Sequence, residues 1–152
     1  MDCDVIVIGA GPAGSSAAYF LAKAGAAVVL IDAKRFPRHK PCAGWLSRKA
    51  VEAFPLVDRA RRRVGAAAFK RMVFHSPDLA QTAEFKRRSH LGYVVDRDAF
   101  DHALVRAAEA AGVETRLGQK VEAVEAREII GQTSNVFFRD QRGLRSHHRV
   151  GA

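Results

Sequence analysis

Asp4–Asp32, DVIVIGAGPAGSSAAYFLAKAGAAVVLID, is the stretch of sequence that decides the fold. It opens with Val5–Ile8, a run of β-branched residues short enough for a strand that is buried on both faces. A glycine-rich turn and a helical pattern follow, with Gly25 just past the end of the helix. Ala27–Ile31 is then a second apolar run. This order predicts two buried strands joined through a helix, the unit from which parallel sheets are built.

The turn after the first strand has the pattern G-x-G-x-x-G. Gly9 permits a tight turn, Gly11 lets backbone approach a diphosphate, and Gly14 lets the helix pack close to the strand. The N-terminus of that helix offers free N–H groups and a partial positive charge. We therefore expect this turn, with Pro12 and Ala13, to bind the diphosphate of a dinucleotide.

The second strand ends at Asp32, about 20 residues beyond the glycines, which is the spacing that brings an acid to a ribose hydroxyl. An acid at a strand end can also be merely solvated. The complete order of strand, turn, helix, strand and acid favours binding of an adenine dinucleotide, and we include Ala33 in the predicted site. On the helix, one packed side is predicted to carry Ala17, Ala18, Leu21 and Ala22.

Val5–Ala22 carries no charged residue and has about the length that spans a bilayer. Glycines, a proline and two serines interrupt it, so a buried strand and helix are favoured over a membrane span. The acidic start of the chain also argues against a secretory signal. Two cysteines, Cys3 and Cys42, make no disulfide framework. We expect a cytoplasmic protein, with peripheral contact with a membrane left open.

The chain has 152 residues, enough for one domain, and a formal net charge of +9. Solvated basic faces and attraction for an anionic cofactor account for this charge. A basic protein that binds nucleic acid or a membrane surface without enzymatic activity is the alternative from another class. The basic clusters lack interleaved aromatic residues, which disfavours nucleic acid.

The rest of the chain predicts a loop, a second long helix and several short elements. Ala33–Gly44 reads as an irregular loop, and Asp98–Ala111 as a helix that packs through an apolar stripe and ends at Gly112. Val113–Arg116 is expected to form a third parallel strand. The last stretch, Gly143–Ala152, shows no clear period. The other predicted elements are helices at Ser47–Phe54 and Leu56–Arg63 and strands at Phe69–His75, Gln81–Phe85, Leu91–Val95, Val121–Ala126 and Asn135–Arg139. The helical stripe consists of Phe100, Ala103, Leu104, Ala107 and Ala111.

The predicted fold class is α/β, a Rossmann-like three-layer dinucleotide fold that is incomplete. It comprises strands one to three plus inserted small antiparallel strands. We expect a dinucleotide domain at 1–126, with an insertion at about 33–95. The remainder, 127–152, is expected to be a meander and an irregular tail.

Three blocks together resemble a known family: the glycine unit that ends in Asp32, the loop Phe36–Gly44 (FPRHKPCAG), and Val94–Asp101 (VVDRDAFD). The combination resembles the geranylgeranyl reductase-like branch of the flavoprotein monooxygenase superfamily, which also includes flavin-dependent halogenases. The resemblance covers about residues 2–126, and the basic-Pro-Cys-x-Gly loop is its most specific part.

The resemblance implies FAD as the cofactor, with NAD(P)H as a candidate electron donor. The first unit would bind the ADP part, backbone at Val121 would meet the adenine, and Arg97 of the R-x-x-F-D pattern would help to hold the cofactor. The cysteine loop would lie beside the isoalloxazine ring, with Cys42 as the candidate catalytic residue. The loop residues so implied are Lys40, Cys42, Ala43 and Gly44.

By the same resemblance, reduced flavin would deliver hydride to an alkene of an isoprenoid lipid. A hydroxylase or halogenase of the superfamily is the alternative. Trp45 after Gly44 departs from the family pattern and adds bulk near the implied ring pocket. Family members are more than twice as long. We therefore expect a truncated chain, and the missing C-terminal half of the enzyme is its expected partner. By itself the chain is expected not to turn over.

His39 and Cys42 have the spacing of half a metal site. A second Cys/His pair of suitable spacing would be needed to complete four ligands, so a zinc site is disfavoured and no metal is predicted. Cys3 is predicted to be a core residue at the start of the first strand. The chemistry is expected to belong to the cofactor.

Overall fold

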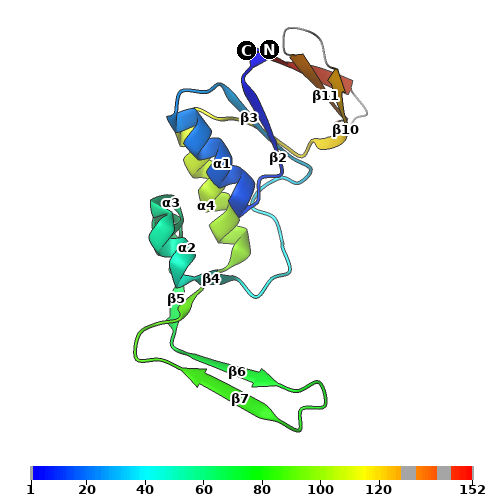
Figure 1. Cartoon of the computed structure of the whole chain (residues 1–152). Coiled ribbons are helices and arrows are strands. Elements are labelled where there is room, and N and C mark those ends of the chain that lie inside the picture. Colours follow the sequence, from blue (N-terminus) through cyan, green and yellow to red (C-terminus); the bar gives the residue numbers. More distant parts are fainter. Residues whose placement is uncertain (1, 128–132, 140–144, 152) are drawn as a thin grey trace. The chain divides into compact units, whose positions relative to one another are not determined.

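The computed structural model describes residues 2–127, 133–139 and 145–151. The chain divides into two compact units, residues 1–38 with 101–152 and residues 39–100. The first unit contains the glycine turn and the strands on either side of it (Figure 1). A domain boundary after residue 126 stays a prediction.

The first unit is built on a parallel sheet of β2 (Val5–Ile8), β3 (Val28–Asp32) and β9 (Glu114–Leu117), in the order β2-β3-β9. Helix α1 (Pro12–Lys23) connects β2 to β3, and α4 (Arg97–Ala110) precedes β9. Each element lies within two residues of its predicted range. The predicted Rossmann-like arrangement of three parallel strands is confirmed.

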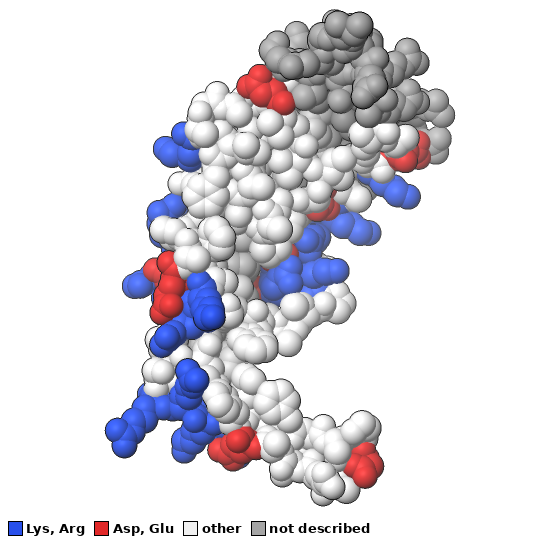
Figure 2. All heavy atoms as spheres, in the orientation of Figure 1, with Lys and Arg blue, Asp and Glu red and all other residues white. Residues whose placement is uncertain are grey.

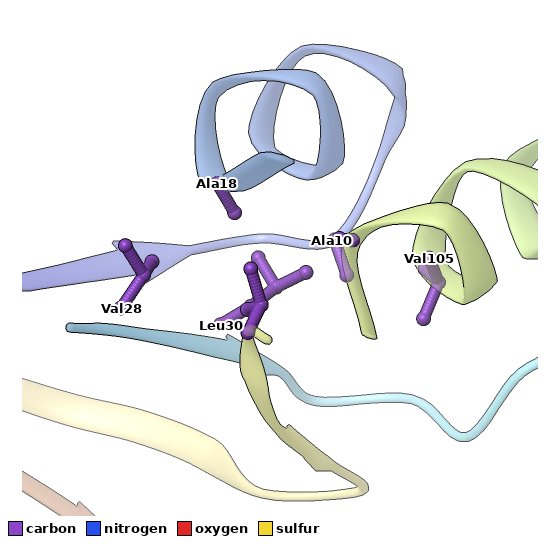
Figure 3. Packing of buried hydrophobic residues seen from close by; sticks show 7 residues of the cluster. Ala10, Ala18, Val28, Leu30 and Val105 are labelled. Carbon is purple, nitrogen blue, oxygen red and sulfur yellow. The ribbon is translucent and has the colours of Figure 1, made fainter. Parts of the chain in front are cut away.

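Successive side chains of β3 point to opposite faces of the sheet, and this alternation creates two cores. On one face, Val28 and Leu30 pack in a cluster with Ala10, Ala18 of α1 and Val105 of α4 (Figure 3). Small residues on α1 let the helix approach the sheet closely. The two helices thus cover one face of the parallel sheet.

The other face of β3 carries Val29 and Ile31, which pack with Cys3, Ile6 and Val121. Cys3 is buried, as predicted, and belongs to β1 (Asp2–Cys3). Helices, parallel sheet and a second sheet therefore form the three layers.

The second sheet has the order β1-β12-β11-β10. Strands β10 (Lys120–Arg127) and β11 (Thr133–Arg139) are antiparallel, which confirms the predicted meander. Strand β12 (Arg145–Gly151) lies antiparallel to β11 and parallel to β1. The prediction of an irregular tail is wrong for residues 145–151, which form a strand. Pairing with two neighbouring strands orders this segment, although its own sequence has no strand pattern.

Three of the four residues predicted for the packed side of helix α1 lie there. Ala18 is buried, and Leu21 and Ala22 pack against the core cluster, whereas Ala17 is exposed. Ser15 is fully buried, and its hydroxyl donates a hydrogen bond of 3.0 Å to the carbonyl of Ala10. That bond satisfies the polar group and allows serine to take a core position.

The second unit contains a small antiparallel sheet in the order β4-β8-β5, two short helices, and a separate hairpin of β6 and β7. Ser47 begins the first helix, and its Oγ accepts a 3.1 Å hydrogen bond from the N–H of Ala50. This cap confirms the predicted helix start. The elements are β4 (Trp45–Ser47), α2 (Arg48–Ala53), α3 (Pro55–Arg63), β5 (Ala67–Phe69), β6 (Arg71–His75), β7 (Thr82–Lys86) and β8 (Gly92–Val94). Strand β4 was not predicted.

Candidate cofactor site

The three glycines of the turn between β2 and α1 are under different structural constraints. Gly9 has φ of +98°, in the left-handed region that favours glycine. A Cβ at Gly14 would lie 1.8 Å from the carbonyl oxygen of Gly9, so only glycine permits this approach of helix and turn. A Cβ at Gly11 would meet only Nη2 of Arg38, at an ordinary 3.7 Å. Gly11 is therefore not required by the packing of the described chain.

The N-terminus of α1 is open to an anion. Gly11 is the N-cap and supplies no side-chain hydrogen bond, and the first turn contains no acidic residue. Pro12 occupies the first helical position, where no N–H is needed. The N–H groups of Ala13 and Gly14 lie in the first turn, where the helix itself provides no acceptor. The free N–H donors of the first turn and the positive end of the helix dipole thus lie at the same end of α1.

Asp32 fastens this turn to the end of β3. Its Oδ2 accepts a 2.8 Å hydrogen bond from the N–H of Ala10, and its Oδ1 accepts one of 2.8 Å from the N–H of Lys34. Each carboxylate oxygen can accept more than one hydrogen bond, so the group can still receive a ribose hydroxyl. The sequence predicted the ribose role but not this second, structural role.

A hollow of about 240 Å³ opens at the carboxyl ends of β2 and β3, the edge where open α/β sheets bind ligands. It brings together four of the predicted site residues: Gly9, Asp32, Ala33 and Val121. Ile8, Ile31, Gln119 and Lys120 complete its lining. The Oε1 of Gln119 is buried and has no hydrogen-bond partner among the described residues. Nothing in the sequence pattern pointed to Gln119, because a lone polar residue after a glycine reads as a turn.

In the second unit, the cysteine loop is held by Gly44. This residue has φ of +70°, and a Cβ there would lie 2.1 Å from the carbonyl oxygen of Val95. The N–H of Val95 donates to the Gly44 carbonyl at 3.0 Å, while the N–H of Gly44 donates to Sγ of Cys42 at 3.4 Å. Backbone packing alone therefore explains the glycine. Cys42 is exposed.

The same loop is tied to the start of α4. The N–H of Lys40 donates to Oδ1 of Asp98 at 3.2 Å. Asp96 caps the helix, because its Oδ1 accepts from the N–H groups of Asp98 at 2.8 Å and Ala99 at 3.2 Å. Arg97 is half-buried next to this cap. The cofactor contacts of Lys40, Cys42, Ala43, Gly44 and Arg97 stay predictions, and so does a catalytic role for Cys42.

Trp45 lies on β4 opposite Val94 and is 55% exposed. Its ring packs edge-on against Phe69, with 6.0 Å between the ring centroids. His39 is exposed and lies 3.6 Å from Asp98, measured from Nδ1 to Oδ2. Within the described part of the chain, no group of three or more His, Cys, Asp or Glu side chains is placed to hold a metal ion.

Some arginine side chains of the second unit are paired with acids. Figure 2 shows acidic groups close to basic ones on the face that it presents. Asp58 binds both Arg61 and Arg62, and Arg71 binds Glu84 at 2.9 Å. Paired arginines present less charge to a polyanion. Among the same residues, no helix is long and apolar enough to cross a bilayer.

The sequence matches the FAD binding domain family over residues 2–152. This chain belongs to that family. The predicted cofactor, FAD, is thereby confirmed. The described residues fit its ADP end: the open helix N-terminus suits a diphosphate, and the hollow beside Asp32 suits an adenosine.

An uncharacterised protein of Methanosarcina barkeri is 37% identical to this FAD-binding chain over 142 residues, which cover 90% of the chain and 35% of the relative. A digeranylgeranylglycerophospholipid reductase of Methanosarcina mazei is 38% identical over 118 residues, covering 75% of the chain and 28% of the reductase. The chain thus spans about a third of the length of these two relatives. The predicted resemblance to the geranylgeranyl reductase-like branch is confirmed.

Among solved structures, the FAD-dependent halogenase CndH, a myxobacterial chondrochloren halogenase, superimposes with a TM-score of 0.79 and is 27% identical. The match covers 97% of this chain and 35% of the halogenase. This match confirms the predicted fold class. It also confirms the predicted superfamily, which includes flavin-dependent halogenases.

Proposed function

We propose that this FAD-binding domain serves an oxidoreductase that reduces carbon–carbon double bonds of an isoprenoid lipid. The observation that carries the proposal is the 38% identity to a digeranylgeranylglycerophospholipid reductase over 75% of the chain. The reaction, its substrate and its electron donor, for which NAD(P)H is a candidate, are parts of this proposal.

In this proposal the chain's own residues hold the cofactor at its nucleotide end. The N–H groups of Ala13 and Gly14 receive the diphosphate, Asp32 receives the ribose, and backbone at Val121 borders the adenine. Bound FAD, once reduced, supplies a hydride. The thiol of Cys42 is exposed on a loop held by Gly44, where it is a candidate proton donor to the lipid.

A halogenase or hydroxylase is the second candidate function. The specific observation in its favour is the likeness to the halogenase CndH, which extends over 97% of this chain. The two candidates predict different products from the same lipid. A reductase adds hydrogen, whereas the alternatives add oxygen or halogen.

We also propose a location in the cytoplasm, with peripheral contact with a membrane. The support is chemical: an isoprenoid lipid resides in the bilayer, and the chain carries a net charge of +9, which attracts anionic headgroups.

The test exchanges domains with the reductase of M. mazei. The aligned part of that enzyme is replaced by this chain, and the chimaera is incubated with the unsaturated lipid and a reductant. We expect FAD to copurify and the lipid to gain the mass of two hydrogens per reduced bond. Products that instead gain oxygen or halogen would favour the second candidate.

Two controls make the result interpretable. The parent reductase shows that the lipid and reductant suffice, and the Gly11→Val chimaera shows that activity depends on FAD bound by this chain. A chimaera that is folded and loaded with FAD but leaves the lipid unchanged, beside an active parent, would contradict the proposal.

A further inference from the structure

Arg38 places a guanidinium group next to the glycine turn of the first unit. Its Nη2 lies 3.7 Å from the position that a Cβ would take at Gly11. Gly11 is the N-cap of α1, the end of the helix that carries a partial positive charge. A cation at this end is unfavourable unless an anion is close by.

The guanidinium is held firmly from two other sides. Its Nη2 lies 3.3 Å from Oδ2 of Asp101, a fully buried carboxylate on α4. Its Cζ lies 4.7 Å from the centroid of the Phe36 ring. The side chain is 14% exposed. Restraint of this kind fixes a donor in place before any ligand arrives, and less entropy is lost on binding.

These protein contacts do not satisfy the guanidinium. Nη1 is buried and has no hydrogen-bond partner among the described residues. A guanidinium has five N–H donors in a planar fork, and buried polar groups are rarely left without an acceptor. The fork matches the oxygens of phosphate groups, which it can bind through two parallel hydrogen bonds.

Neutralising Asp101 is the simpler role for Arg38, but it leaves one observation unexplained. The ion pair with Asp101 engages Nη2 and supplies no acceptor for the buried Nη1. An anion bound at Gly11 would place an acceptor beside this guanidinium. We propose that Arg38 binds the diphosphate of the cofactor at the glycine turn, bridging the diphosphate and Asp101.

This inference rests on FAD binding by the chain, and the test separates the two. Affinities for adenosine, ADP and FAD are measured by calorimetry for the 152-residue chain and for Arg38→Ala and Arg38→Lys. Arg38→Ala is expected to weaken the binding of ADP and of FAD by the same factor, roughly ten- to hundredfold, because a charged hydrogen bond is lost. Adenosine, which has no phosphate, is expected to keep its affinity. Arg38→Lys keeps the positive charge beside Asp101 but loses the fork, so an intermediate loss is expected.

Arg106→Ala is the matched control. It removes the same charge from an exposed arginine of α4 that pairs with Glu109 at 2.9 Å, and it should leave all three affinities unchanged. Circular dichroism checks each variant, and if Arg38→Ala does not fold, Arg38→Lys decides.

Several results would overturn the inference. Unchanged ADP affinity in the Arg38 variants would do so directly. An equal loss for adenosine and ADP would mean that Arg38 acts only through the shape of the turn. If the parent chain bound neither ADP nor FAD, FAD binding itself would fail and the inference would fall with it.

Discussion

Gly11 and Gly14 lie in one turn but differ in their tolerance of a side chain. A Cβ at Gly14 would collide with the Gly9 carbonyl, whereas a Cβ at Gly11 finds space beside Arg38. We expect Gly14→Ala to lose the native fold and Gly11→Val to fold but lose FAD, because its side chain occupies the place of the diphosphate. Circular dichroism measures folding and calorimetry measures binding. A folded Gly11→Val chain with full FAD affinity would disprove the phosphate role of the turn.

Asp32 joins two roles, so its variants are expected to change both binding and stability. Asp32→Ala removes the ribose acceptor, worth about 1.5–3 kcal/mol or roughly ten- to hundredfold in FAD affinity. It also leaves the N–H groups of Ala10 and Lys34 without their acceptors, so the melting temperature should fall. Asp32→Asn should cost less in affinity, because its amide oxygen still accepts. Fluorescence titration with FAD that gave equal affinities for the parent and Asp32→Ala would contradict the ribose assignment.

The two cysteines are expected to react at very different rates. Cys3 is 5% exposed and burial raises the pKa of its thiol, whereas Cys42 is exposed. Because the thiolate is the reactive form, two effects slow the reaction of Cys3: the reagent has poor access to it, and its thiol stays protonated. A thiol reagent at mildly alkaline pH should label Cys42 at once and Cys3 only after denaturant is added. Rapid labelling of both thiols, with Cys42→Ser as the control, would show that β1 opens readily.

At the scale of an element, the start of α4 depends on one carboxylate. Asp96 accepts from two N–H groups of the first turn, and Val105 further along the helix is fully buried in the core. Asp96→Ala should lower the free energy of unfolding by about 0.5–2 kcal/mol, the usual cost of losing an N-cap. Asp96→Asn keeps an acceptor oxygen and serves as the control. Denaturant unfolding that gave equal midpoints for Asp96→Ala and the parent would mean that the cap contributes nothing.

The elements that were predicted well are those whose signals are local. Strand β2 follows from an apolar run that ends at Gly9, helix α1 from an apolar pattern between two glycines, and strand β3 from an apolar run that ends at Asp32. Strand β12 could not be predicted, because its order comes from pairing with β11 and with the two residues of β1. The three-residue strand β4 was missed because it is too short to show a period.

The residues of the candidate site can also be divided into those with a local sequence signal and those without one. Gly9 and Asp32 were found from their spacing along the chain. Arg38 was not, because its partner Asp101 is distant in sequence and is recognised only when α4 packs on the parallel sheet. Ser15 shows the same limit, since a buried polar residue becomes understandable only when its acceptor, the Ala10 carbonyl, is known.

At the scale of the whole molecule, the nucleotide end of the site belongs to one unit. Every residue that lines the hollow lies in the first unit, whereas the hairpin β6–β7 belongs to the second. The two hairpin strands pair only with each other among the described strands, and most of their side chains are exposed. The hairpin is therefore expected to be dispensable for binding ADP.

A deletion tests this independence. The N–H of Arg87 donates to the carbonyl of Lys70 at 3.0 Å, so an Asn-Gly turn can replace residues 71–86 without separating these two residues. We expect the melting temperature and the ADP affinity of the shortened chain to equal those of the parent, because the deletion removes little buried surface. Calorimetry with ADP measures binding of the nucleotide end of the cofactor, and calorimetry with FAD adds the flavin end. A loss of ADP affinity in the folded, shortened chain would show that the nucleotide site extends beyond the first unit.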